Sequence, residues 1–310
     1  MAVIWVTGGH GFIGRNLARH LADSGARVLG IGHGHWPESE AHRWGLTNWL
    51  NGAIEPANLD QLAKNGGIPD AVYHLAGGST VGASLRTPLE DFTRTVSTGA
   101  QLFDWLRKEA PKASVVVVSS AAVHGAGHVG PIDALSPLRP FSPYGHHKLM
   151  LEQLMKSYAE NFGLRGVIVR LFSVYGPWLS KQLLWDLCSR LAGGVELLEL
   201  GGDGGELRDW TEIGDIARLL SLVESAASTD VPVINGGSGI ATPVRDIARM
   251  LVEAWGEHTV SVEFSGIVRH GDPYSLVSAP CTVSGSPYTW QTPVSVGIKH
   301  YVDWFKKTSN

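Results

Sequence analysis

A glycine-rich turn joins the first apolar segment of the chain to the first helical one. Residues 2–7 are a short apolar run, and Phe12–Ser24 repeats apolar residues at helical intervals. Between them, Gly8 allows a tight turn, Gly11 lets backbone approach a pyrophosphate, and Gly14 lets the helix pack against the strand. The first helical amides would also face the phosphates. This order predicts a dinucleotide site formed by Gly8, Gly11, Phe12, Ile13 and Gly14.

Short apolar runs and helical patterns alternate through the first half of the chain. Four consecutive valines lie in the run Ser114–Ser119, as expected of a strand that is covered on both faces. The alternation predicts an α/β fold with a doubly wound, parallel Rossmann-type sheet. Its strands are expected at Ala2–Thr7, Arg27–Ile31, Ala71–Leu75, Ser114–Ser119 and Gly166–Leu171, and its long helices at Leu89–Lys108 and Pro143–Phe162.

The sequence pattern changes after Gly176-Pro177, where the apolar and helical segments become shorter and more irregular. We therefore expect a dinucleotide-binding domain over residues 1–176. A smaller C-terminal α/β part over 177–310 would bind the substrate and return some elements to the first domain. Ligands favour the cleft between two such parts.

Composition excludes several classes of function. The 310 residues carry a net charge of −4, which gives no basic field for nucleic acid. Cys188 and Cys281 cannot form a disulfide framework, and no run approaches the ~18 apolar residues that span a membrane. Because the first strand begins at residue 2, we expect no signal peptide. We expect a cytoplasmic protein that binds neither nucleic acid nor membrane.

The second predicted strand ends in Ile31-Gly32-His33-Gly34-His35, where many NAD enzymes carry an acid for the ribose. Without that acid, His33 and Arg15 can face a 2′-phosphate, which favours NADP over NAD. NAD bound without the carboxylate is the alternative. A metal site at His33, His35 and His42 would lack an acidic or cysteine partner, so we expect none.

Tyr144 and Lys148 lie four residues apart, on one face of the predicted helix Pro143–Phe162. A neighbouring ammonium and a cationic nicotinamide ring favour the phenolate, so Tyr144 can exchange a proton with a substrate hydroxyl during hydride transfer. Ser120 follows a strand at the sheet edge where ligands bind, and can hydrogen-bond the same oxygen. The alternatives are an ordinary amphipathic helix and a serine that caps a turn.

Together these segments resemble the extended short-chain dehydrogenases/reductases, of the NAD-dependent epimerase/dehydratase type that acts on nucleotide sugars. Residues 81–90 are similar to UDP-galactose 4-epimerases. The matching segments are TGGHGFIG (7–14), HLAGGSTVGAS (74–84), SSAAVHG (119–125), SPYGHHK (142–148), RLFSVYGP (170–177), GGDGGELRDW (201–210) and RHGDP (269–273).

The resemblance implies roles for particular residues. It implies Ser120, Tyr144 and Lys148 as the catalytic set, with Tyr144 and Lys148 also contacting the cofactor. Leu75, Ala76 and Gly77 would contact the cofactor too. The substrate would be bound by Ser79, Ser120, Ser173, Arg208 and Arg269, the two arginines on its diphosphate.

Three departures from the family pattern narrow the activity. Ser173 and Thr95 stand where many relatives have asparagine, so the pocket is not a standard one. Ala121-Ala122 stand where 4,6-dehydratases carry Asp-Glu for elimination, which disfavours a dehydratase.

These features favour a nucleotide-sugar epimerase, 4-epimerase-like, of carbohydrate biosynthesis, which uses NAD(P) and a nucleotide-diphosphate sugar. An NADPH-dependent 4-keto-sugar reductase uses the same residues, and a cofactor-binding sensor without turnover is the third hypothesis. The resemblance also implies a homodimer through helices 89–108 and 143–162.

Overall fold

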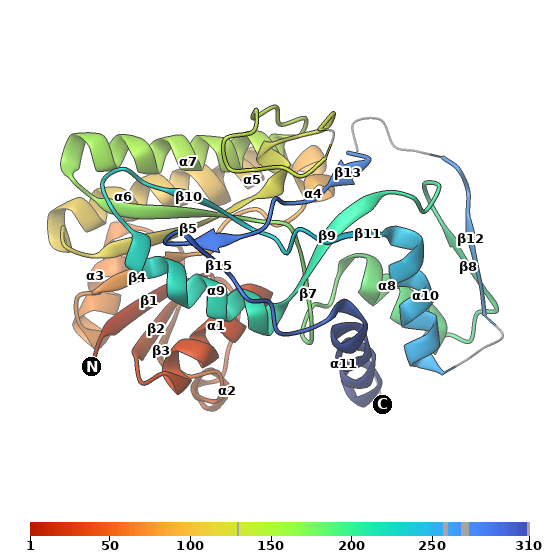
Figure 1. The fold of residues 1–310 in the computed structure, drawn as a ribbon. Coiled ribbons are helices and arrows are strands. Elements are labelled where there is room, and N and C mark those ends of the chain that lie inside the picture. The colour runs from red at the N-terminus through yellow and green to blue at the C-terminus, as the bar shows by residue number, and fades with distance from the viewer. Residues whose placement is uncertain (129, 257–259, 268–272, 309–310) are drawn as a thin grey trace.

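A seven-stranded parallel sheet forms the centre of the molecule (Figure 1). The computed structural model describes residues 1–128, 130–256, 260–267 and 273–308. Along the sheet the strands are β10 (Val233–Gly236), β6 (Arg165–Leu171), β5 (Ser114–Ser120), β4 (Ala71–His74), β1 (Val3–Thr7), β2 (Arg27–Gly32) and β3 (Leu46–Asn51). This arrangement confirms the predicted doubly wound Rossmann-type fold.

Helices cover both faces of the sheet, and strand β5 shows why its valines alternate between two cores. Val116 and Val118 pack in the core beneath α1 (Phe12–Asp23) and α9 (Ile213–Val223). Val115 and Val117 point the other way, into the core beneath α3 (Pro56–Gly66), α6 (Thr98–Glu109) and α7 (Pro143–Phe162). Since side chains of a strand alternate, a run of four valines serves both layers.

The helix predicted over Leu89–Lys108 is confirmed, with a π-helical turn in its α-helical hydrogen bonding. It consists of α5 (Pro88–Phe92), a π-helical turn (Thr93–Ser97) and α6. The π-turn carries Thr95, which is fully buried and accepts a hydrogen bond from the amide of Gly78 at 2.8 Å. Such turns occur frequently at functional sites, and this one faces the loop that follows β4.

The C-terminal part forms a third core from short elements (Figure 1). Its mixed sheet contains β7 (Ser173–Tyr175), β9 (Leu207–Glu212), β11 (Ala241–Pro243) and β13 (Ser275–Leu276). A second sheet pairs β8 (Leu197–Leu200) with β12 (Ser261–Phe264). A hairpin pairs β14 (Thr282–Val283) with β15 (Ser286–Pro287). The helices there are α8 (Gln182–Ala192), α10 (Val244–Trp255) and α11 (Val294–Thr308).

Two elements after residue 177 pack with the first half of the chain. Strand β10 pairs with β6, and helix α9 packs against α1, where His20 Nε2 lies 3.1 Å from Ser221 Oγ. The boundary near residue 177 stays a prediction. Two short helices, α2 (Glu38–Arg43) and α4 (Val81–Arg86), complete the first half. No helix of the described part is both long and apolar enough to cross a membrane.

Asp209, in β9, ties three segments together. Its fully buried carboxylate accepts hydrogen bonds from the amides of Ser238, Gly239 and Ser278, at 2.8, 2.9 and 3.2 Å. The hydroxyl of Ser238 donates a fourth bond at 2.6 Å. One side chain thus joins the small sheet to the loop after β10 and to the segment after β13.

We expect Asp209→Ala to lower the free energy of unfolding by roughly 3 kcal/mol, because several buried donors lose their acceptor. Urea unfolding followed by circular dichroism measures the change. Asp303→Ala is the control, since that exposed carboxylate of α11 pairs with Lys299 of its own helix and should change stability little. Equal effects of the two substitutions would contradict this account.

Candidate active site

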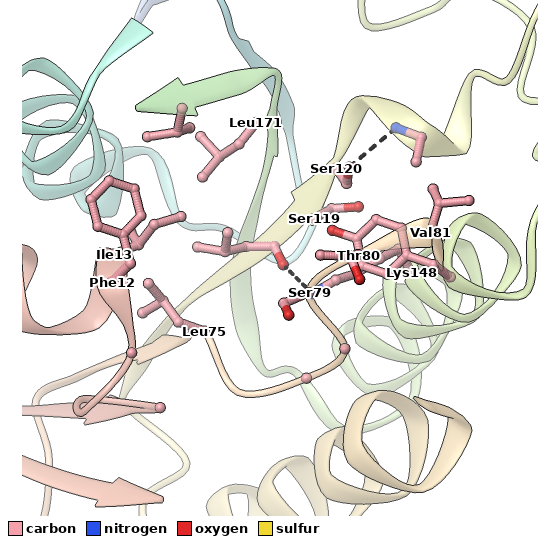
Figure 2. A pocket seen from close by; sticks show the side chains of 18 of the residues that line it. Phe12, Ile13, Leu75, Ser79, Thr80, Val81, Ser119, Ser120, Lys148 and Leu171 are labelled. Atoms are coloured by element: carbon pink, nitrogen blue, oxygen red, sulfur yellow. Dashed lines mark hydrogen bonds between the residues drawn. The ribbon is translucent and has the colours of Figure 1, made fainter. Parts of the chain in front are cut away.

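A cavity of about 800 Å³ opens where the carboxyl ends of the central strands meet the C-terminal part (Figure 2). Ligands of open α/β sheets bind at this edge. Most of the predicted site residues line this one cavity: Gly8, Gly11, Phe12, Ile13, Gly14, His33, Leu75, Ala76, Gly77, Ser79, Ser120, Tyr144, Lys148, Ser173 and Arg208.

The glycine-rich turn shapes one wall of the cavity. Gly8 has a positive φ of 71°, and its carbonyl accepts from the amide of Gly11 at 2.9 Å. A Cβ on Gly14 would lie 2.3 Å from the carbonyl oxygen of Gly8, so a larger residue would push α1 away. Gly11 is the N-cap of α1, and the first-turn amides of a helix have no acceptor within it. This wall therefore suits an anion such as a pyrophosphate.

Arg15 does not line the cavity, so the structure does not place it toward the predicted 2′-phosphate. Its Nη2 donates to the carbonyl of His10 at 2.7 Å. Its guanidinium lies 5.3 Å from the ring centres of Trp36 and Trp44 and 5.5 Å from that of Trp178. These contacts hold Arg15 away from the cavity. Of the two residues predicted to face a 2′-phosphate, His33 lines the cavity and Arg15 does not.

Tyr144 and Lys148 lie one turn apart at the start of α7. Pro143 opens this helix, and the side chain of Ser142 caps it by accepting from the amide of Gly145 at 3.2 Å. Lys148 Nζ lies 6.0 Å from the centre of the Tyr144 ring. Burial raises the pKa of Tyr144, while a hydrogen bond with Ser120 opposes the rise. Figure 2 shows Ser120 and Lys148 at the same end of the cavity.

The ammonium of Lys148 is buried, and opposing effects determine its pKa. Burial lowers its pKa to about 8, while the carboxylates of Asp91 and Glu152 act to raise it. Nζ donates to the carbonyl of Val118 at 3.1 Å. Asp91 is itself buried, with its Oδ2 at 2.6 Å from Nδ1 of His147. At neutral pH most of the Lys148 side chains keep their charge next to Tyr144.

A buried ion pair supports the strand end that carries Ser120. Ser119 Oγ donates to Oε1 of Glu152 at 2.6 Å, and Arg170 Nη2 lies 2.7 Å from the other oxygen of that carboxylate. His124 is packed against this group, 3.5 Å from Arg170 Nη1, and burial lowers its pKa to about 4. His124 is therefore neutral at physiological pH.

The far end of the cavity belongs to the C-terminal part. Arg208 and Trp210 line it, and Arg208 Nη1 donates to the carbonyl of Leu207 at 2.9 Å. Arg269, the other predicted phosphate ligand, lies outside the described residues. Trp178 and Trp185 pack on Trp304 rather than in the cavity.

The charged side chains in the described lining of the cavity are all basic. Its described lining contains Arg94, Lys148, Lys181 and Arg208 but no aspartate or glutamate. Together with the open first turn of α1, these residues fit a dinucleotide and a second phosphorylated ligand. Among the described residues no group of three histidine, cysteine or acidic side chains could hold a metal ion.

Comparison with known proteins agrees with this geometry. A family model described as the NAD-dependent epimerase/dehydratase family matches residues 4–235. The chain belongs to that family. This membership confirms the resemblance drawn from the motifs.

The similarity to individual relatives covers almost the whole chain. A UDP-glucose 4-epimerase of Azospirillum brasilense is 32% identical over 295 residues, which cover 89% of this chain and 83% of that protein. The UDP-glucuronic acid 4-epimerase of Bacillus cereus, solved with UDP-glucuronic acid and NAD, superimposes with a TM-score of 0.86 at 26% identity and covers 99% of both chains. MoeE5, solved with the same two ligands, gives 0.85 at 29% identity and covers 98% of this chain and 99% of its own.

Sequence reasoning missed several lining residues. Gly52 and Ile54 follow β3, a partly polar edge strand that the apolar pattern did not reveal. Lys181 stands four residues after Pro177, outside the matching motifs, and nothing in its spacing marks it.

We expect Gly14→Ala to weaken dinucleotide binding at least about tenfold, because its methyl group would meet the carbonyl of Gly8 and displace the start of α1. Isothermal titration calorimetry with NAD and NADP measures the loss. Gly201→Ala is the matched control, since among the described residues its Cβ would approach the carbonyl of Ile267 alone, at 4.0 Å. Unchanged affinity in folded Gly14→Ala would reject the predicted role of the turn.

Proposed function

We propose that this protein is a nucleotide-sugar 4-epimerase that works with a bound nicotinamide dinucleotide. The observation that carries the proposal is the meeting of Ser120, Tyr144 and Lys148 in a cavity with a glycine-rich turn at one end and Arg208 at the other. That arrangement suits a sugar ring held between a cofactor and a diphosphate.

The three side chains divide the proton chemistry between them. When bound, the cofactor supplies a reversible acceptor for hydride. Tyr144 Oη takes the proton of the sugar hydroxyl as hydride leaves the same carbon, and the ammonium of Lys148 favours the phenolate that does so. Ser120 Oγ hydrogen-bonds the same oxygen. If the sugar ring turns in the cavity before Tyr144 Oη returns the proton to that oxygen, the carbon would be inverted with no net oxidation.

The neighbouring residues support epimerisation over elimination. Ala121 and Ala122 line the cavity directly after Ser120 and offer no acid or base. The UDP-glucose 4-epimerase and the UDP-glucuronic acid 4-epimerase among the relatives are named for the activity proposed here.

The choice between NAD and NADP remains part of the proposal. The predicted preference for NADP now depends on His33, because Arg15 faces its tryptophans. The two solved relatives described above carry NAD. Mass spectrometry of the cofactor released from fresh protein identifies which dinucleotide is bound.

The test of function is a panel of UDP-, dTDP- and GDP-sugars followed by proton NMR. We expect one sugar pair to interconvert without net redox change, and Tyr144→Phe to lower kcat by roughly 10²- to 10⁴-fold. Tyr158→Phe is the control, since this tyrosine of the same helix packs on Phe103 and Phe162. Consumption of NADPH only with a 4-keto sugar would establish the reductase instead. Occupied sites without turnover would establish the sensor.

We also propose a homodimer through α7 and the segment before α6. An exposed groove on this face is lined mainly by apolar side chains, among them Val96, Leu149, Met150 and Leu154. A second copy would cover them as a four-helix contact. We expect Met150→Asp to convert the dimer to a monomer in light scattering, and Leu222→Asp, at an exposed leucine of α9, to leave it intact. A wild-type monomer would refute the proposal.

We propose cytoplasmic carbohydrate biosynthesis as its setting. Cys188 and Cys281 are both free and buried, which suits a reducing compartment.

A further inference from the structure

Lys181 joins two walls of the cavity. It is the N-cap residue of α8, and its Nζ donates to Oγ of Ser79 at 2.9 Å. Ser79 lies in the loop after β4, so this bond joins the wall built by the C-terminal part to the wall built by the central sheet. Both side chains line the cavity.

The bond lies near the reacting end of the cavity. Gly77, two residues before Ser79, approaches Lys148 so closely that a Cβ there would lie 3.3 Å from Nζ. Figure 2 shows Ser79 and Thr80 at the end that also holds Ser120 and Lys148. Arg208 lies instead with Trp210 on strand β9.

The charge of Lys181 has no acidic counterpart in the described cavity lining. The other lining cations have partners of their own: Arg94 pairs with Glu90, Lys148 donates to the carbonyl of Val118, and Arg208 donates to the carbonyl of Leu207. Burial lowers the pKa of Lys181, and no carboxylate offsets this effect. An anion placed beside Nζ would therefore gain a strong, charge-assisted hydrogen bond.

The two side chains have donors left for such an anion. An ammonium carries three N–H donors, of which Ser79 uses one. Because the oxygen of Ser79 accepts from Lys181, its own proton is free to point toward a ligand. The pair thus presents an ammonium and a hydroxyl to the same oxygen or to neighbouring oxygens.

We propose that Lys181 and Ser79 form a subsite that binds an anionic oxygen of the nucleotide-sugar substrate. This inference rests on the proposed function, because it needs a nucleotide sugar in the cavity. A phosphate linked to the sugar and a carboxylate on the sugar ring share the required chemistry. The first would make Lys181 a general substrate ligand, and the second would make it a determinant of specificity for acidic sugars.

The test measures binding without turnover. Isothermal titration calorimetry uses Tyr144→Phe protein loaded with its dinucleotide, with UDP-glucose and UDP-glucuronic acid as matched neutral and acidic probes. We expect an added Lys181→Gln to weaken binding roughly 10- to 100-fold. Loss with both sugars identifies the phosphate, and loss with UDP-glucuronic acid alone identifies the carboxylate.

Two further variants separate the subsite from general damage. Lys181→Arg keeps the charge and should restore most of the affinity. Lys299→Gln, at an exposed cation of α11, should leave binding unchanged.

Unchanged affinity for both sugars in Lys181→Gln, or a loss confined to the dinucleotide, would overturn the proposal. Failure of the proposed function looks different: the sugars bind and respond to Lys181, but the wild-type protein interconverts none. If no UDP-, dTDP- or GDP-sugar binds the wild-type protein, both proposals fall.

Discussion

The close approach of helix α1 to strand β1 determines the geometry of the cavity. With no side chain at Gly14, the helix rests against the carbonyl of Gly8. Gly8 in turn lies against the loop after β4, where its Cβ would be 3.0 Å from the amide of Ala76. Helix α9 packs beside α1 in the same core. A shift of α1 would therefore move its first-turn amides, and would also disturb the β4 loop and α9.

The second constraint is the buried charge of Lys148. Moving an ammonium out of water is costly. This one is tolerated because Asp91 and Glu152 lie near and the carbonyl of Val118 accepts a hydrogen bond from it. Glu152 also holds Arg170 and Ser119, so the same carboxylate links the charge of the site to the end of strand β5. The proposed proton chemistry at Tyr144 thus depends on Asp91, Glu152 and Arg170, which do not line the cavity.

The sequence predicted the parts of this structure that local patterns specify. The valine run of β5, the glycine spacing and the Tyr144–Lys148 interval each depend on residues within one element. Strand β3 was missed because only Leu46 of this edge strand is buried, and its polar residues interrupt the apolar run expected of a buried strand. The π-helical turn depends on Thr95 meeting the amide of Gly78. Arg15 lies among Trp36 and Trp44, which flank α2, and the distant Trp178, a contact that spacing does not reveal.

The cationic cavity also limits what chemistry the site can perform. Elimination of water from a sugar needs an acid and a base beside the ring, and the described lining has no carboxylate to serve. In the proposed function Tyr144 carries the proton in both directions, which suits a reaction that ends without net oxidation. The cations are then available for binding. Arg208 and Lys181 come from different segments of the C-terminal part. In the proposed function, changes in those segments would alter which substrate binds, while the residues for proton transfer on β5 and α7 stay the same.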